Sequence, residues 1–379
     1  MKGTRMLRSP IVFAGLSCAI AIGAYVAGCD STTEEVVDQT GRQPPPPPAN
    51  APPANGPGAV FAMNKLFLGG TDRNGNPSKT AWKEYGYNLD KKISTAASTD
   101  VCKPNAGGSP KVHDDGTDGI DNAFGKELWP IIQGLAPTAE ADINESIVDG
   151  QFTIIVDMTN LGPEANYLDI LGKLYAGTEM ADPPVWDGSD MWPVAPELLE
   201  NPSDIGSAKV VFPKSYLNNN TWVSGTPGTI NLAVSVQGTD FNLSITQATI
   251  TMKLDAAHEK ATDGVIAGII QVETLISELQ KVAGSFSSSL CEGTTFDSIA
   301  NQLRQASDIL SDGSQDPSKT CDGISIGLGF ESLPIQLGEV SDPSPPGPDP
   351  CSSEGGSGGE PQGGSGGTPQ GGAGGTGGA

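Results

Sequence analysis

The feature that most constrains the fold is a strict alternation of apolar and polar residues. Apolar residues occupy every second position from Ile230 to Val236 and again from Phe241 to Ile245. Between the two runs lies Gly238-Thr239-Asp240, a sequence typical of a turn. A period of two places alternate side chains on one face of a β-strand. The segment therefore predicts a β-hairpin with one buried face.

The second of these runs changes its phase. Beyond Ile245 the apolar positions are Ala248, Ile250, Met252 and Leu254, which have the opposite parity. One extra residue in a strand turns the following side chains to the other face. A β-bulge, or a strand that crosses between two sheets, is therefore expected near Thr246-Gln247.

The same alternation predicts two further strands. Alternate residues are apolar from Phe152 to Met158 and from Ile324 to Phe330. The second strand carries Gly327 and Gly329 on its other face, which predicts close backbone packing there.

Helical spacing occurs late in the chain. Five apolar residues recur at intervals of three and four, although the first part, 265–270, fits a buried strand equally well: Val265, Ile269, Val272, Ile276 and Leu279. A second helix is predicted from Phe296 to Leu310, with Thr294 or Thr295 as its cap. We expect the apolar face of each helix to pack against the core of the domain.

The composition divides the chain into four parts. Residues 1–28 have the features of a signal peptide, 29–58 form a proline-rich linker, 59–340 a β-rich domain, and 341–379 a Pro/Gly/Ser-rich tail. The linker, with the run Pro44 to Pro48, and the tail are predicted to be disordered because they cannot bury enough apolar surface. For 59–340 we expect a mainly β fold, a β-sandwich or jelly-roll-like domain with one or two late helices. The alternative is an α+β domain with one curved sheet.

The amino-terminal residues point to an exported protein. A basic start is followed by an apolar run from Ile11 to Val26, and the run ends in Val26-Ala27-Gly28-Cys29. This arrangement resembles the type II signal peptide and lipobox of bacterial lipoproteins. The resemblance implies that Cys29 carries a lipid, that this lipid attaches the chain to a membrane, and that the protein works in the cell envelope. The alternatives are an uncleaved membrane anchor and an ordinary signal peptide that happens to contain a cysteine.

Four cysteines remain if Cys18 leaves with the cleaved signal peptide and Cys29 is lipidated: Cys102, Cys291, Cys321 and Cys351. An even number in an exported chain predicts disulfides, and four cysteines allow three pairings. Our preferred pairing joins Cys291 to Cys321, which leaves Cys102 with Cys351. A structural zinc site is disfavoured because the chain has no CxxC motif and two histidines.

The charge balance limits the class of partner. The formal net charge is −24, so the surface repels nucleic acid and favours cations. Oxygen ligands cluster between residues 114 and 122, where glycines permit a tight turn, and they make calcium a candidate cofactor: Asp114, Asp115, Asp118, Asp121 and Asn122. The spacing departs from an EF-hand, because Gly116 and Gly125 occupy the third and twelfth positions. An Asp/Gly turn without metal is the alternative. A weaker cluster of the same kind lies at 72–76.

No catalytic motif stands out. Outside the glycine-rich tail, where repeated glycines match GxSxG and GxGxxG by composition alone, the chain lacks GxSxG, HExxH, GxGxxG and Walker sequences. Trp186 and Trp192 flank a polar turn and could contact a sugar, or could pack beneath the loop. We therefore expect a non-enzymatic envelope lipoprotein whose domain is a binding or structural module with a glycan or protein partner. A lipid-anchored hydrolase that cleaves glycans with paired carboxylates is the main alternative. A carrier of apolar ligands around the 265–279 stripe is a third.

Overall fold

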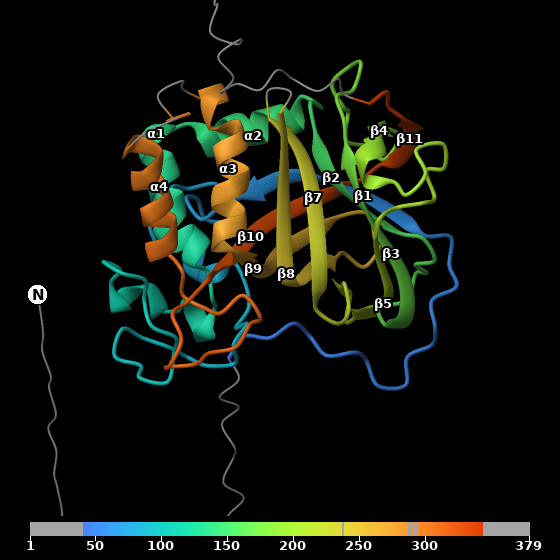
Figure 1. Cartoon of the computed structure of the whole chain (residues 1–379). Coiled ribbons are helices and arrows are strands. Elements are labelled where there is room, and N and C mark those ends of the chain that lie inside the picture. The colour runs from blue at the N-terminus through green and yellow to red at the C-terminus, as the bar shows by residue number, and fades with distance from the viewer. Residues whose placement is uncertain (1–40, 237–238, 287–289, 292–293, 344–379) are drawn as a thin grey trace, which may run out of the picture. The chain divides into compact units, whose positions relative to one another are not determined.

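The computed structural model describes residues 41–236, 239–286, 290–291 and 294–343. The lipobox, Cys351 and nearly all of the predicted tail lie outside these residues. Figure 1 shows a broad, strongly curved sheet with helices gathered on one side of it and irregular segments below.

The strands form one sheet that closes into a barrel. The order β3-β2-β1-β10-β9-β8-β6-β5 is closed by pairing of β5 with β3, while β4 and β11 extend the sheet from β3 and β7 pairs with β8. The strands are β1 (Ala59–Phe67), β2 (Thr153–Met158), β3 (Tyr167–Gly177), β4 (Met191–Val194), β5 (Val210–Asn218), β6 (Thr221–Val223), β7 (Gly228–Val236), β8 (Thr239–Leu254), β9 (Ala261–Gln271), β10 (Gly323–Pro334) and β11 (Gln336–Val340).

The predicted mainly β fold with late helices is confirmed. The two facing layers expected of a sandwich are supplied here by opposite walls of one closed sheet. The predicted hairpin is β7–β8, in which Val236 pairs with Thr239. The bulge is also where the alternation placed it: the register of β8 against β9 shifts between Thr246 and Thr249, and Gln247 has a positive φ of 49°.

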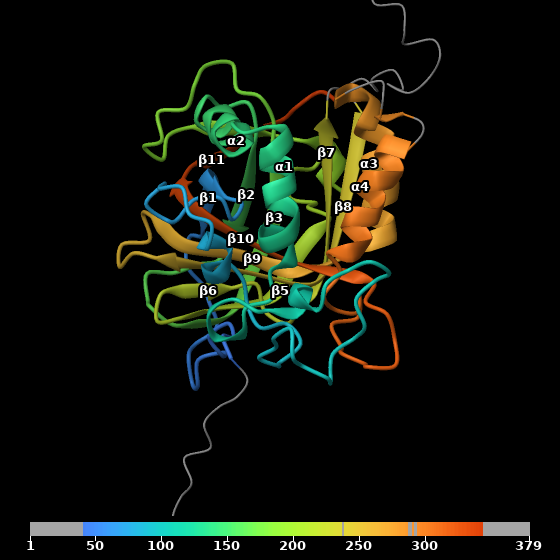
Figure 2. The same cartoon turned by 90° about the vertical axis from the view of Figure 1, so that its left-hand side faces the viewer.

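Four α-helices are described: α1 (Trp129–Leu135), α2 (Ala139–Val148), α3 (Val272–Phe286) and α4 (Thr294–Gln305). Short turns of other helix types span Ala81–Glu84, Pro110–His113, Thr117–Gly119, Phe124–Leu128 and Pro196–Leu198. The sequence did not indicate α1, because Pro130 and Gly134 interrupt it. In Figure 2, α1 lies in front of the sheet, with α3 and α4 side by side at its edge.

The late helices pack as the sequence predicted, with one correction. The first begins at Val272, since residues 261–271 form strand β9, so the strand alternative holds for 265–270. The second ends at Gln305, five residues before Leu310. Their apolar faces join the same core as the inner barrel residues, for example Ile276, Phe296 and Trp222.

The proline-rich linker differs from its prediction. From Gly41 onward it is not a free spacer but runs along the lower edge of the barrel and up one side to β1 (Figure 1). Main-chain bonds fix it at both ends: Arg42 N–H donates to Asp118 O at 2.7 Å, and Ala54 N–H donates to Leu168 O at 2.8 Å. We call residues 41–58 the strap.

Candidate functional site

The five predicted calcium ligands lie in an irregular segment, 68–123, that packs on the outer face of β9 and β10. Gly327 of β10 permits this approach, as its sequence position suggested, because a Cβ there would overlap the carbonyl oxygen of Tyr85. Hydrogen bonds from Asn122 hold this segment against β10. Its Nδ2 donates to the carbonyls of Tyr85 and Gly327 at 3.0 and 2.9 Å, and its Oδ1 accepts from the Gly327 N–H at 3.0 Å.

The four aspartates of the set also bond to main chain. Asp121 Oδ2 accepts from Leu89 N–H at 2.6 Å. Asp115 and Asp114 accept from the main-chain N–H groups of Ser94 and Ala96. The main-chain carbonyl of Asp118 accepts from Arg42 N–H. These contacts are those of turn-forming residues, and in the described part of the chain no group of three or more His, Cys, Asp or Glu side chains is arranged to hold a metal. The 72–76 cluster is likewise a turn, closed by Asp72 Oδ1 accepting from the N–H groups of Asn74 and Asn76.

Next to Asp115 and Asp121 lies a buried network that the sequence did not reveal. Asp90 Oδ2 accepts from Gln315 Nε2 at 2.7 Å, and Gln315 also donates to the carbonyl of Asp308 at 3.1 Å. Asp308 accepts from the N–H and hydroxyl of Ser325 on β10. His113 Nδ1 donates to the Asp308 carbonyl at 3.0 Å. The network therefore joins residues that are as many as 225 positions apart.

Burial in this region disfavours the charged carboxylates. It raises the pKa of Asp115 to about 8 and that of Asp308 to about 7, and repulsion from Asp90 adds to both shifts. Burial, with repulsion from Asp90, Asp115 and Asp308, holds the pKa of Asp121 well above its usual range. Burial lowers the pKa of His113, which favours its neutral form. These groups stabilise the loop rather than face solvent.

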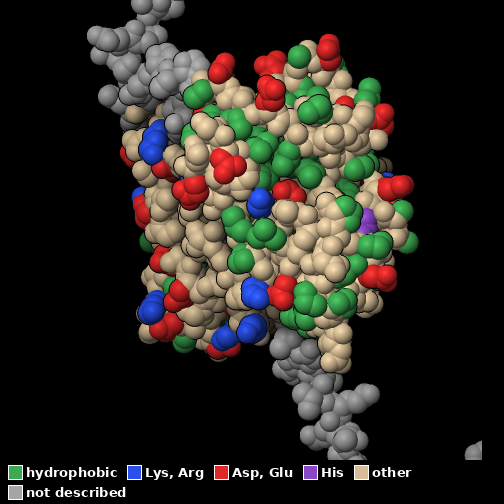
Figure 3. Space-filling view, turned by 90° about the vertical axis from the view of Figure 1, so that its right-hand side faces the viewer, with side chains coloured by type: hydrophobic (Ala, Val, Ile, Leu, Met, Phe, Trp, Pro, Cys, Tyr) green, Lys and Arg blue, Asp and Glu red, His purple; other side chains and the backbone are tan. Residues whose placement is uncertain are grey.

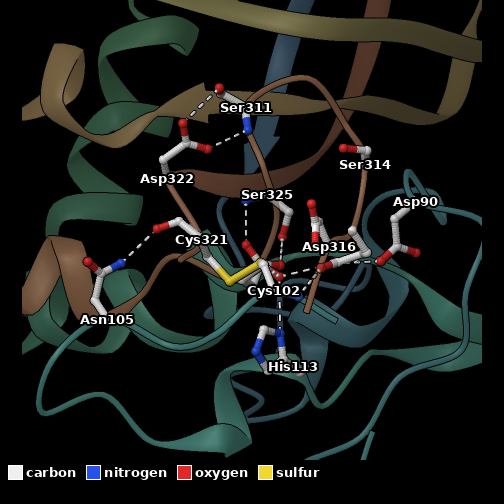
Figure 4. The surroundings of a disulfide bond; sticks show 12 residues. Asp90, Cys102, Asn105, His113, Ser311, Ser314, Asp316, Cys321, Asp322 and Ser325 are labelled. Atoms are coloured by element: carbon white, nitrogen blue, oxygen red, sulfur yellow. Dashed lines mark hydrogen bonds between the residues drawn. A yellow bond between two sulfur atoms is a disulfide. The ribbon is translucent and has the colours of Figure 1, made fainter. Parts of the chain in front are cut away.

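The disulfide of this region corrects our preferred pairing. Cys102 is bonded to Cys321, with their Cα atoms 5.2 Å apart, beside His113 and Ser325 (Figure 4). Main-chain bonds bring the two together: Lys103 N–H donates to Lys319 O, and Cys321 N–H donates to Lys103 O. Cys291 is also disulfide-bonded. The preferred pairing failed because spacing along the chain does not indicate which irregular segments run side by side.

The two tryptophans do not form a sugar-binding surface. Trp192 is fully buried, and its Nε1 donates to Thr178 O. Trp186 packs against it with ring centroids 5.3 Å apart. The packing alternative therefore holds. Figure 3, which shows the side of the molecule around β3, β4 and β5, has acidic groups spread singly and basic ones gathered toward its lower edge.

A cavity lies beneath the strap. Its volume is about 610 Å³. Tyr87, Asn88, Tyr216 and Thr249 form a buried floor. Pro44 and Pro47 of the strap line it, and the remaining lining residues form the sides and the exposed rim: Gln43, Leu89, Lys91, Leu168, Asp169, Lys214, Gly225, Thr226, Pro227 and Gln247.

Two side chains hold the proline run over this cavity. Tyr216 Oη donates to Pro45 O and Asn218 Nδ2 donates to Pro46 O, both at 2.7 Å. A proline has no N–H, so these carbonyls are the polar groups that the run can offer. The strap is thus recognised as extended proline-rich peptides generally are, by an aromatic hydroxyl and an amide.

A smaller cavity of about 220 Å³ lies between residues 107–112 and α4. Neither cavity is lined by the 265–279 stripe, of which Val272, Ile276 and Leu279 pack in the main core. The carrier hypothesis therefore has no support from the described residues.

No family model, curated protein or solved structure matches this chain. Among the described residues, no helix has both the length and the apolar character needed to cross a membrane.

Proposed function

We propose that the protein is a lipid-anchored binding module of the cell envelope, with its ligand site in the cavity beneath the strap. The lipobox sequence supports the anchor, and the cavity supports the binding role. A volume of about 610 Å³ lies within the range of small-molecule sites, which combine an apolar lining with a few fixed polar groups.

The lining favours binding over the hydrolase alternative. Asp169 is the one carboxylate among the residues described around this cavity, and it is paired with Lys214 at 2.7 Å. A glycoside hydrolase of the usual kind needs two carboxylates facing the scissile bond. The described lining does not supply the second.

The first test concerns the anchor. Cys29→Ser should move the protein from the membrane fraction of its host cells to the soluble fraction. Retention of this variant in the membrane would contradict the lipid anchor without bearing on the cavity.

The second test concerns the cavity. The soluble Cys29→Ser form is mixed with the insoluble envelope fraction of the producing cells and sedimented. We expect the protein to sediment with this fraction, and Thr226→Trp, which fills the cavity from its exposed rim, to reduce the bound share at least tenfold. Ser203→Trp, in an exposed turn outside the lining, is the matched control and should bind normally. Equal sedimentation of both variants would exclude the cavity as the site.

A further inference from the structure

We propose that the site beneath the strap recognises an extended proline-rich segment of another envelope protein, with bulky apolar side chains at two positions three residues apart. The strap's own proline run, Pro44 to Pro48, occupies this site in the structure and has to leave before that segment binds. This inference rests on the proposed function and specifies the ligand class of the same site.

The run itself shows what the barrel face accepts. Tyr216 Oη donates to the carbonyl of Pro45, and Asn218 Nδ2 donates to that of Pro46, both at 2.7 Å. Two donors of one strand, β5, thus meet two consecutive carbonyls. A chain in the polyproline II conformation has no internal hydrogen bonds, so it can offer its carbonyls to such donors whatever its side chains are.

The edges of the run differ with a period of three. Pro44 and Pro47 line the cavity, whereas the other three prolines of the run do not. A polyproline II helix has three residues per turn, so residues three apart lie on one edge. In any chain bound in the same register, the side chains at these two positions would therefore point into the cavity.

Proline residues do not fill the space on this edge. A cavity of about 610 Å³ remains between the run and the barrel. Leu89, Leu168 and Pro227 contribute apolar groups to its lining. A longer apolar side chain at either position would contact these groups and remove apolar surface from water, which the proline rings cannot do.

The charged residues of the lining select no charged ligand. Lys91, Asp169 and Lys214 are all exposed, and Lys214 is paired with Asp169. Charges at such positions are screened by water and salt, so they discriminate little between an anion and a cation. The selectivity of the site therefore comes from the carbonyl contacts and from the shape of the cavity.

The sequence indicates that the segment comes from another protein. Every pair of consecutive prolines in this chain is flanked on at least one side by alanine, serine, glutamine, aspartate or a third proline. A second copy would therefore offer a run no better than the one already bound. Exchange of runs between two copies would replace each contact with an identical one and gain nothing.

The test first weakens the competing run. In the Cys29→Ser form, glycine replaces Pro44, Pro45, Pro46 and Pro47, so that the run no longer favours the extended conformation. Three fluorescent peptides serve as probes in anisotropy titrations. The first has the native sequence of residues 43–51, Gln-Pro-Pro-Pro-Pro-Pro-Ala-Asn-Ala. The second is Gln-Leu-Pro-Pro-Leu-Pro-Ala-Asn-Ala, and its control, Gln-Pro-Leu-Leu-Pro-Pro-Ala-Asn-Ala, has the same composition but adjacent leucines.

We expect the peptide with leucines three apart to bind the glycine variant at least tenfold more tightly than the native-sequence peptide, and at least threefold more tightly than its control. It should bind the protein with the intact run at least tenfold more weakly, because that run competes from within the same molecule. In the glycine variant, Tyr216→Phe should weaken binding about threefold to tenfold, the equivalent of one hydrogen bond. Tyr167→Phe, whose hydroxyl accepts from Glu164 N–H, should leave binding unchanged.

The outcomes separate the inference from the function on which it rests. If no peptide binds while envelope sedimentation stays sensitive to Thr226→Trp, the cavity is a binding site but the proline-rich class is wrong. If the native-sequence peptide binds as tightly as the leucine peptides, a second copy is the source and the inference is overturned. Binding that Tyr216→Phe does not weaken also overturns it, because the peptide then lies elsewhere. If no peptide binds and sedimentation is insensitive to Thr226→Trp, both proposals fail.

Discussion

Two irregular parts of the molecule are fixed to the barrel in opposite ways: the segment at 68–123 with its buried contacts, which we call the loop network, and the strap at 41–58. In the loop network, Asp and Asn side chains accept from main-chain N–H groups, as Asp121 and Asn122 do, and both of these side chains are buried. In the strap, the proline run has no N–H to donate, and side chains of the barrel reach out to its carbonyls. The first arrangement gives a rigid, filled layer, whereas the second leaves a cavity between its points of attachment.

This contrast predicts that changes in the loop network cost stability, while changes around the strap chiefly affect binding. The largest effect should follow removal of the Cys102–Cys321 disulfide. Its partners are 219 residues apart, so the crosslink excludes a very large loop from the unfolded chain. Cys102→Ala combined with Cys321→Ala should lower the free energy of unfolding by about 4–5 kcal/mol, measured by urea denaturation. An unchanged value would show that the contacts of the network alone hold this layer.

Asn122→Ala should have the next largest effect. It leaves the buried N–H of Gly327 and the carbonyls of Trp82, Tyr85 and Gly327 without their side-chain partner. Several such losses should together cost about 3–4 kcal/mol in the same measurement. Asn301→Ala, exposed on α4, should change stability by less than about 0.5 kcal/mol. Similar losses in the two variants would contradict the assigned role of Asn122.

The buried carboxylates make stability depend on pH. Asp115 keeps its proton in the folded state until about pH 8, whereas an unfolded aspartate releases it near 3.8. The folded state therefore binds more protons over this interval, and its stability falls as the pH rises through the folded pKa. We expect a lower free energy of unfolding at pH 9 than at pH 7, and a smaller difference in Asp115→Asn. A rise in stability over this interval would show that the carboxylates are charged when folded. The lowered pKa of His113 acts below this window, so it does not obscure the result.

The smallest effect on stability is expected at the strap. Tyr216→Phe removes the bond to Pro45 O and retains the ring, so it should cost about 0.5–1.5 kcal/mol. It should nevertheless accelerate proteolysis within residues 41–52, because the proline run loses one of its two side-chain anchors. Tyr167→Phe, whose hydroxyl accepts from Glu164 N–H and does not bond to the proline run, is the control and should leave the cleavage rate unchanged. Equal cleavage of Tyr216→Phe and the wild type would show that the bond from Tyr216 is not needed to hold the proline run in place.

The spacing of apolar residues and glycines in the sequence predicted those parts of the fold that form between residues close together in the chain. The β7–β8 hairpin, the bulge at Gln247 and the close approach at Gly327 all follow from residue spacing. The strands of the described sheet begin at Ala59 and end at Val340, but the packed chain also includes the strap before them.

The site could not be predicted in the same way, because it depends on contacts between distant segments. Tyr216 and Pro45 are 171 positions apart, and neither residue carries a signal of the other. Within the acidic run at 114–122, Asp115 raises the pKa of Asp121, but Asp90 and Asp308 from elsewhere in the chain raise it as well, and the spacing of the run gives no sign of them. Spacing along the chain therefore identified only part of this group of interacting carboxylates.

The docking of the strap also sets how far the protein can reach. If Cys29 is held in a membrane by its lipid, a linker free as far as residue 58 would let the domain extend about 100 Å from the bilayer at full stretch. With the chain fixed to the barrel from Gly41 onward, eleven residues, 30–40, separate Cys29 from the barrel in the sequence, and eleven residues can span at most about 40 Å. The protein would then sample a shallow layer above its own membrane, and its ligand must be available within that layer.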